Sequence, residues 1–392
     1  MRTFGRSMLA EWALDPAVTY LNHGTVGATP RRVLEAQQRI RDEIERQPSR
    51  FLLRELSAVA IGAPLERPRL RAAAAAVGAF LGARGEDLVF VDNATTGTNA
   101  VLRSLEFRDG DEILLTDHVY GSVARIVAFV ARRSGARVRT VELPYPPRCP
   151  RDVTEAFAGA LGPRTRLAVV DHVTSESALI LPVAEIAARC RAKGVPLLVD
   201  GAHGPGAIPV DIPSLGADWY SANLHKWAFA PRSSGVLWAA PERQAGLHPA
   251  VISWGFDEGF TTEFDWVGTR DPSPHLAAPA AIEFMEELGA GAVRAYDHGL
   301  AWEAARHLAG RWGTALEIPE EMTGAMVTLP LPERLGGDEA RATRLRNALL
   351  FEDGIEVQIH AWRARLWVRL SAQVYNEMAD FERLGEAVLR RA

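Results

Sequence analysis

Short apolar segments alternate with amphipathic segments through the first half of the chain, and this alternation constrains the fold most. Each short run of mostly Val, Leu, Ile and Phe is followed by a longer segment with apolar residues at helical spacing. We expect strands at 88–91, 113–115, 137–143, 167–170, 197–199 and 235–238, and helices at 30–47, 122–133, 153–161 and 183–193, with another starting near 93. Apolar strands joined by helices indicate an α/β fold with a mostly parallel sheet covered by helices on both faces.

The pattern changes near residue 276. Long helical segments come first, followed by expected strands at 326–331, 355–360 and 366–370 and a final helix at 376–391. This mixture predicts a smaller α+β domain, and 392 residues are enough for a large and a small domain. We expect the large, ligand-binding domain at 20–275. The small C-terminal domain should consist of 276–392 together with the N-terminal residues 1–19.

Composition and charge argue against several classes of protein. The chain is 47% hydrophobic and 24% charged, which suits a soluble globular protein. A net charge of −5 gives no reason to expect a nucleic acid or an anionic membrane as partner. No apolar run reaches the roughly 20 residues that span a bilayer, and the first 16 residues lack a signal-peptide core. Only two cysteines, Cys149 and Cys190, fit a reducing compartment, so we expect a cytoplasmic protein.

The scarcity of lysine points to a chemical site. Of the 44 basic residues only Lys193 and Lys226 are lysine, and the other 42 are arginine. A primary amine can lose its proton and attack a carbonyl, whereas a guanidinium stays charged. Lys226 also lies among apolar residues, which disfavours a solvated surface role. The lysine also belongs to a pattern expected of a pyridoxal 5'-phosphate (PLP) Schiff-base site. This pattern is an acid, a histidine and then a His-Lys pair, here Asp200, His203 and His225-Lys226.

Other polar motifs follow the expected strands, and ligands gather at the carboxyl ends of such strands. Thr95 and Thr96 lie where a helix begins, so they could hold a phosphate, or simply cap the helix. Asp200 could pair with the pyridine nitrogen and keep the ring an electron sink. His203 could reach the ring hydroxyl or a substrate carboxylate, and with Lys226 it is our candidate for catalysis.

Further candidates concern the cofactor ring and its phosphate. Tyr120 or His118 could stack on the ring, and we favour Tyr120. Asn223 and His225 precede the lysine closely enough to touch the phosphate. Thr269, in a polar turn, could supply another hydroxyl to it.

One candidate concerns the substrate. Arg369 lies in an apolar strand, where its planar fork suits an α-carboxylate, although a structural ion pair would explain it too.

Together these residues resemble fold-type I PLP enzymes of the class V aminotransferase superfamily, and within it the isopenicillin N epimerase-like enzymes. The matching segments are Leu21-Asn-His-Gly-Thr-Val-Gly, Phe51-Leu-Leu-Arg-Glu-Leu, Asp200-Gly-Ala-His-Gly-Pro-Gly, Leu224-His-Lys-Trp, Ser253-Trp-Gly-Phe-Asp and Gly268-Thr-Arg-Asp, with Arg369-Leu-Ser near the end. The resemblance implies a seven-stranded sheet, PLP, and an amino-acid or peptide substrate held by Asn22, His23 and Arg369. It also implies a homodimer with shared active sites, in which Thr269 reaches the partner's phosphate.

Several reactions remain open for such a site. An epimerase or racemase would let Lys226 take the Cα proton and a second acid, His203, Tyr120 or water, return one on the other face. A carbon–sulfur β-lyase acting on a cysteine conjugate needs only Lys226, and a transaminase or a non-catalytic PLP protein is also conceivable. We expect an epimerase-like enzyme, with the β-lyase as a close alternative. A cysteine desulfurase needs a thiol expected near residues 320–340, far from Cys149 and Cys190.

The motif positions add further pocket candidates, which are Arg54, His172, Trp254, Phe256 and Arg270. Arg54 and Arg270 could bind a second carboxylate of a dicarboxylate substrate, although surface salt bridges would explain either one equally well.

Overall fold

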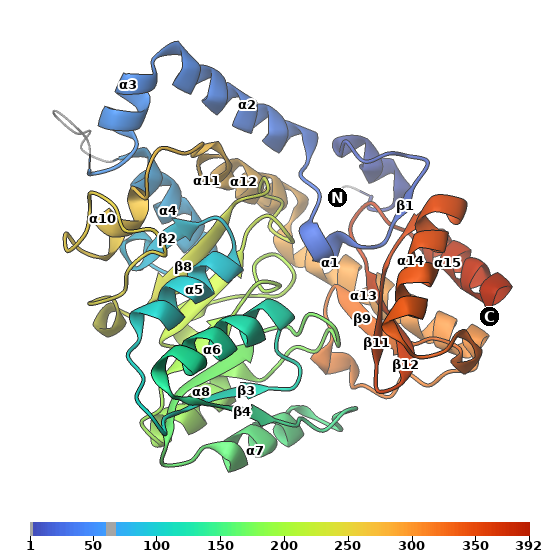
Figure 1. Cartoon of the computed structure of the whole chain (residues 1–392). Coiled ribbons are helices and arrows are strands. Elements are labelled where there is room, and N and C mark those ends of the chain that lie inside the picture. The colour runs from blue at the N-terminus through green and yellow to red at the C-terminus, as the bar shows by residue number, and fades with distance from the viewer. Residues whose placement is uncertain (1–2, 60–67) are drawn as a thin grey trace.

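A seven-stranded sheet forms the centre of the structure, a computed structural model that describes residues 3–59 and 68–392 (Figure 1). Its strand order is β2-β8-β7-β6-β5-β3-β4. β8 runs antiparallel to β2 and β7, and the other neighbours are parallel. The strands are β2 (Leu88–Val91), β3 (Glu112–Thr116), β4 (Arg137–Val141), β5 (Thr165–Asp171), β6 (Leu197–Asp200), β7 (Trp219–Asn223) and β8 (Gly235–Ala239). The predicted mostly parallel sheet is confirmed.

Helices cover both faces of this sheet. Alternate residues of one strand enter different cores: Leu197 and Val199 join one cluster, and Leu198 joins the other. This two-sided burial explains why the strands are continuously apolar. One face is covered by α5 (Ala94–Ser104), α6 (Gly121–Ser134) and α10 (Phe260–Asp265). The other face is covered by α4 (Arg69–Phe80), α7 (Pro150–Ala160), α8 (Val183–Ala192) and α12 (Ala278–Leu288).

The small C-terminal domain has its own antiparallel sheet, in the order β11-β12-β9. Its strands are β9 (Met326–Pro330), β11 (Gln358–Trp362) and β12 (Arg365–Ser371), and its helices are α13 (Ala290–Trp312), α14 (Glu339–Asp353) and α15 (Met378–Arg391). The N-terminal strand β1 (Thr19–Tyr20) pairs in parallel with β10 (Ile355–Glu356), so the start of the chain lies against the C-terminal part (Figure 1).

Two further elements connect these parts. α1 (His23–Val26) follows β1 and lies between the two sheets, and α2 (Arg31–Arg46) then runs back over the large domain (Figure 1). Within the described ranges, no helix is both long and apolar enough to cross a membrane.

Candidate active site

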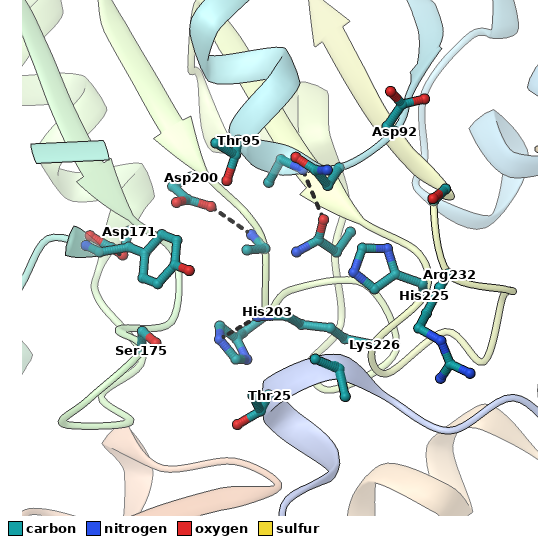
Figure 2. A pocket seen from close by; sticks show the side chains of 17 residues that line it. Thr25, Asp92, Thr95, Asp171, Ser175, Asp200, His203, His225, Lys226 and Arg232 are labelled. Atoms are coloured by element: carbon teal, nitrogen blue, oxygen red, sulfur yellow. Dashed lines mark hydrogen bonds between the residues drawn. The ribbon is translucent and has the colours of Figure 1, made fainter. Parts of the chain in front are cut away.

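A cavity of about 300 Å³ opens where the carboxyl ends of β5, β6 and β7 meet the start of α5. Figure 2 shows Lys226 extending toward His203, with Asp200 and Thr95 farther along the same wall. The residues predicted for the site that line the cavity are Thr95, Tyr120, Asp200, His203, Asn223, His225 and Lys226. The fold thus brings predicted residues that are more than 100 positions apart in the sequence into one cavity.

The start of α5 forms the anion-binding end of the cavity. Asn93 caps the helix, because its Oδ1 accepts a hydrogen bond from the backbone N–H of Thr96 at 2.9 Å. The backbone N–H of Ala94 donates to Asn223 Oδ1 at 2.8 Å, so β7 fixes where the helix begins. Thr95 lines the cavity, whereas the Thr96 hydroxyl turns back to Asn93 at 3.3 Å. The positive end of the helix dipole therefore faces a space suited to a phosphate.

Two buried carboxyl groups lie side by side at the strand ends. Asp171 of β5 and Asp200 of β6 are register partners, and each is at most 3% exposed. Burial raises the pKa of both carboxyl groups, and it raises that of Asp171 well above its usual range. Asp200 Oδ1 accepts the Ala202 N–H at 2.9 Å, and Lys226 favours its charged form. Asp171 Oδ1 accepts the Tyr120 N–H at 3.3 Å, while its Oδ2 is buried and has no partner within residues 3–59 and 68–392.

Lys226 is poised to lose its proton. Burial lowers the pKa of its amine to about 7, and the positive charge of Arg369 acts in the same direction. Asp200 and Asp171 oppose that shift. The amine Nζ lies 3.0 Å from His203 Nε2. Burial, followed by the charge of Lys226, lowers the pKa of His203 well below its usual range, so this imidazole is neutral.

His225 lines the cavity beside Lys226 but is held by the backbone. Its Nδ1 donates to the carbonyl oxygen of Ser234 at 3.0 Å, and burial lowers its pKa to about 4. A neutral ring with hydrogen on Nδ1 leaves Nε2 as an acceptor. In this form Nε2 cannot donate to a phosphate oxygen.

The two candidates for ring stacking are placed differently. Tyr120 lines the cavity and is 43% exposed. His118 is 9% exposed, bonds Ser177 Oγ at 2.7 Å and packs edge-on against Trp362. It is absent from the cavity lining, so geometry favours Tyr120 for stacking.

Arg369 lies just behind the cavity wall. Its guanidinium is 3% exposed, and it donates to Thr25 Oγ1 at 2.8 Å and to the backbone oxygen of Ser175. Thr25 and Ser175 line the cavity. Burial lowers the pKa of Arg369 to about 10, and its buried Nε has no hydrogen-bond partner in the described part of the chain. Across the described ranges, no carboxylate forms an ion pair with it, so its charge would attract an anion.

Asn22 and His23 support this wall instead of lining it. Asn22 Oδ1 accepts from the Thr25 hydroxyl at 2.5 Å and faces Arg369. His23 is fully buried between the Tyr375 hydroxyl at 2.8 Å and the backbone oxygen of Lys226 at 3.0 Å. Both are therefore placed to position Arg369 and Lys226, and neither lines the cavity.

The remaining candidates lie outside the cavity. Thr269 is exposed in the segment after α10, and Arg270 forms an ion pair at 3.0 Å with Asp92, which does line it. Trp254 is 84% exposed and Phe256 48% exposed on one loop. The outlying positions are those of Arg54, His172, Trp254, Phe256, Thr269 and Arg270.

Sequence reasoning missed several lining residues. Asp171 ends an apolar strand in the same way as Asp200, and this signal was present in the sequence. Thr25 lines the cavity from the short helix α1, and Ser175 and Arg232 line it from turns, where no local pattern marks them.

These residues fit PLP. Asp200 suits a pyridinium nitrogen, the start of α5 suits a phosphate, and Lys226 offers an amine to the aldehyde. The unpartnered oxygen of Asp171 is a polar group that a ligand would satisfy.

Comparisons with known proteins give the same assignment. Residues 20–384 match the family described as aminotransferase class-V. The chain is 36% identical to an isopenicillin N epimerase from Streptomyces clavuligerus, over 96% of this chain and 95% of that protein. It is 34% identical to a probable chloroplastic L-cysteine desulfhydrase from Arabidopsis thaliana, over 95% of this chain and 83% of that one.

Solved structures share the fold. A cysteine desulfurase from Thermococcus onnurineus superimposes with a TM-score of 0.80 at 21% identity, covering 100% of this chain and 98% of that one. A cystine C–S lyase in complex with cysteine persulfide gives 0.77 at 23% identity, covering 98% of each chain. The chain therefore belongs to the aminotransferase class V family and is a PLP-dependent enzyme of fold type I.

Proposed function

We propose that the enzyme removes the Cα proton of an amino-acid substrate and then eliminates a sulfur group from Cβ, acting as a carbon–sulfur β-lyase. The observation that carries this proposal is the Lys226 amine in the cavity, 3.0 Å from His203 Nε2 and with its pKa lowered to about 7, because this base suffices for elimination without a second acid. Bound PLP would supply the electron sink for the reaction.

The substrate would be held through its α-carboxylate. Arg369 carries a buried charge without a carboxylate partner among the described residues, directly behind Thr25 and Ser175. A carboxylate that approached between these two residues would offset the cost of burying that charge. This contact would turn the Cα–H bond toward Lys226.

Lys226 would then act as the only base required. The Cα–H bond breaks and its proton passes to Nζ, and the Cβ–S bond breaks with its electron pair on sulfur. Hydrolysis of the released unsaturated amine yields pyruvate and ammonia when the substrate is cysteine or a cysteine conjugate. No acid on the opposite face is needed for these steps.

Epimerisation is the second candidate, and the 36% identity to an isopenicillin N epimerase over almost the full length favours it. It requires an acid on the face opposite Lys226. His203 lies 3.0 Å from Nζ and is neutral, so it shares the side of the lysine. Tyr120, half-exposed at the cavity wall, is the better placed second acid.

The thiol required of a persulfide-forming desulfurase is not at this site. Cys190 is 1% exposed in α8, and Cys149 caps α7. Neither of the two cysteines in the sequence lines the cavity. We therefore propose a lyase that releases sulfur directly.

Two further expectations remain predictions. One is a homodimer in which Thr269 contributes to the partner's site, and the other is a cytoplasmic location.

One experiment separates the candidate reactions. Purified, PLP-loaded protein is incubated in D₂O with L-cysteine, cysteine conjugates and other L-amino acids, and deuterium, chirality, pyruvate and sulfide are measured together. We expect pyruvate with release of sulfide or a thiol. Deuterium at Cα with inversion and no pyruvate would reject the lyase and establish an epimerase.

Lys226→Ala and Lys226→Arg test the shared first step. We expect both variants to lose at least about 10³-fold in Cα exchange, because the arginine keeps the charge but cannot serve as a base at neutral pH. Lys193→Arg, at an exposed position, is the matched control and should retain full exchange. Near-normal exchange in Lys226→Arg would reject Lys226 as the base.

A further inference from the structure

Trp227 is connected to Lys226 indirectly, because both residues contact the ring of His203. The indole Nε1 lies 3.2 Å from His203 Nδ1, and Trp227 is 1% exposed in the core beside the cavity. An indole N–H can only donate a hydrogen bond. His203 Nδ1 must therefore be the acceptor in this contact and carry no hydrogen.

This hydrogen bond decides which nitrogen of His203 carries the hydrogen. The ring is 2% exposed and neutral, since burial holds its pKa well below the usual range. A neutral imidazole without hydrogen on Nδ1 carries it on Nε2. The Nε2–H group then points at Lys226 Nζ, 3.0 Å away.

The strength of the contact between His203 and Lys226 consequently depends on whether the Lys226 amine is protonated. An ammonium group has three hydrogens and no lone pair, so it would meet the Nε2–H group donor against donor. A neutral amine can accept that hydrogen. The other groups acting on the amine are Arg369, which favours the neutral form, and Asp200 and, when it is ionised, Asp171, which favour the ammonium.

We infer that Trp227 is a positioning residue that holds His203 in the Nε2–H tautomer and thereby stabilises the neutral, nucleophilic amine of Lys226. The inference deepens the proposed function and rests on Lys226 being its base. Trp227 touches His203 and acts on Lys226 only through that ring. Without the indole N–H, His203 can move its hydrogen to Nδ1 and accept from a lysine ammonium.

The test measures the pKa of Lys226 directly, using Trp227→Phe, which removes the N–H and keeps an aromatic ring. Cofactor-free, full-length protein is treated with trace acetic anhydride between pH 6 and 10, and acetylation of Lys226 is quantified by peptide mass spectrometry. Lys193, exposed and the only other lysine, serves as the internal reference. We expect the Lys226 midpoint to rise by about 0.7 pH units, the effect of one hydrogen bond, so that acetylation at pH 7 falls about threefold.

Trp219→Phe is the matched control. Trp219 is 3% exposed and its Nε1 has no partner among the described residues, so this variant loses an indole N–H that does not contact His203. It should keep the original midpoint. Equal midpoints for Trp227→Phe and Trp219→Phe, with both variants folded by circular dichroism, would overturn the inference.

A second measurement needs no change at Trp227. The ¹⁵N shifts of His203 in the unmodified protein, assigned by their loss in His203→Gln, should show a protonated Nε2 and an unprotonated Nδ1. A protonated Nδ1 would overturn the inference even if Trp227→Phe failed to fold. Neither measurement involves substrate or turnover, so both stand if the enzyme proves to be an epimerase.

Discussion

At the residue scale, the two carboxyl groups at the ends of β5 and β6 have different tasks although their surroundings are similar. Two adjacent buried carboxylates cannot both ionise cheaply. Asp200 receives the Ala202 N–H and is favoured as an anion by Lys226, whereas Asp171 keeps an oxygen without a partner among the residues that the structure describes and has a pKa well above its usual range. We therefore predict that Asp200 is the anion and that Asp171 holds a proton.

The same substitution at both positions tests this assignment. Asp171→Asn replaces a protonated carboxyl by a neutral group of similar shape, so we expect activity within about threefold of the unmodified enzyme. Asp200→Asn removes the charge that would face the pyridinium, and we expect a loss of about 10²-fold or more. Steady-state kinetics and the visible absorbance of bound PLP measure both effects. Equal losses in the two variants would contradict the assignment.

The sequence predicted Asp200 and His203 because they follow a recognisable strand, whereas it predicted Lys226 and His225 from the scarcity of lysine and from their place after that acid and histidine. It could not predict Thr25 or Ser175, since only the packing of α1 and a loop after β5 brings these residues to the cavity. It also could not show that Asn22 and His23, at the start of α1, lie behind the wall, because their exposure depends on contacts with the distant residues Arg369 and Tyr375.

At the element scale, alternation of apolar strands and helices predicted most of the large sheet. It did not mark β7 as a strand, because Ser221 and Asn223 interrupt its apolar character. Both side chains bond α5: Ser221 Oγ donates to the Ala94 oxygen at 2.9 Å, and Asn223 accepts the Ala94 N–H. The strand expected at 355–360 is divided between two sheets, β10 with β1 and β11 with β12, and no local pattern signals such a division.

The contact between α5 and β7 gives a prediction about cofactor binding. A Cβ atom at Gly97 would lie 2.2 Å from Ser221 Oγ, so Gly97→Ala should push the start of α5 away from β7. We expect about tenfold weaker PLP binding, measured by absorbance titration, because the phosphate would lose its helix N–H groups.

Gly159→Ala is the matched control, because Gly159 is in helix α7 and a Cβ atom there meets nothing within 4 Å. It should leave PLP binding unchanged and stabilise the helix by roughly 0.5–1 kcal/mol. Unchanged PLP affinity in Gly97→Ala would show that the start of α5 does not hold the phosphate.

At the scale of the whole molecule, one loop carries an unusual concentration of exposed apolar side chains. Val251, Ile252, Trp254 and Phe256 are between 48% and 84% exposed, and they precede α10 and the segment with Thr269. Several large, exposed apolar side chains in one segment are more typical of an interface than of a free surface. The prediction from the sequence that Thr269 serves the partner's site would place this loop at the dimer contact.

Mixing two inactive variants tests a shared site. Lys226→Ala loses the base, and Thr269→Glu should repel the phosphate by its negative charge. If Thr269 acts in the partner's site, a hybrid dimer has one site with both Lys226 and Thr269 intact. Random reassociation of equal amounts should then restore about a quarter of the original activity, because half the dimers are hybrids with one working site each. If the mixture stays inactive although light scattering shows dimers that exchange subunits, Thr269 does not act across the interface.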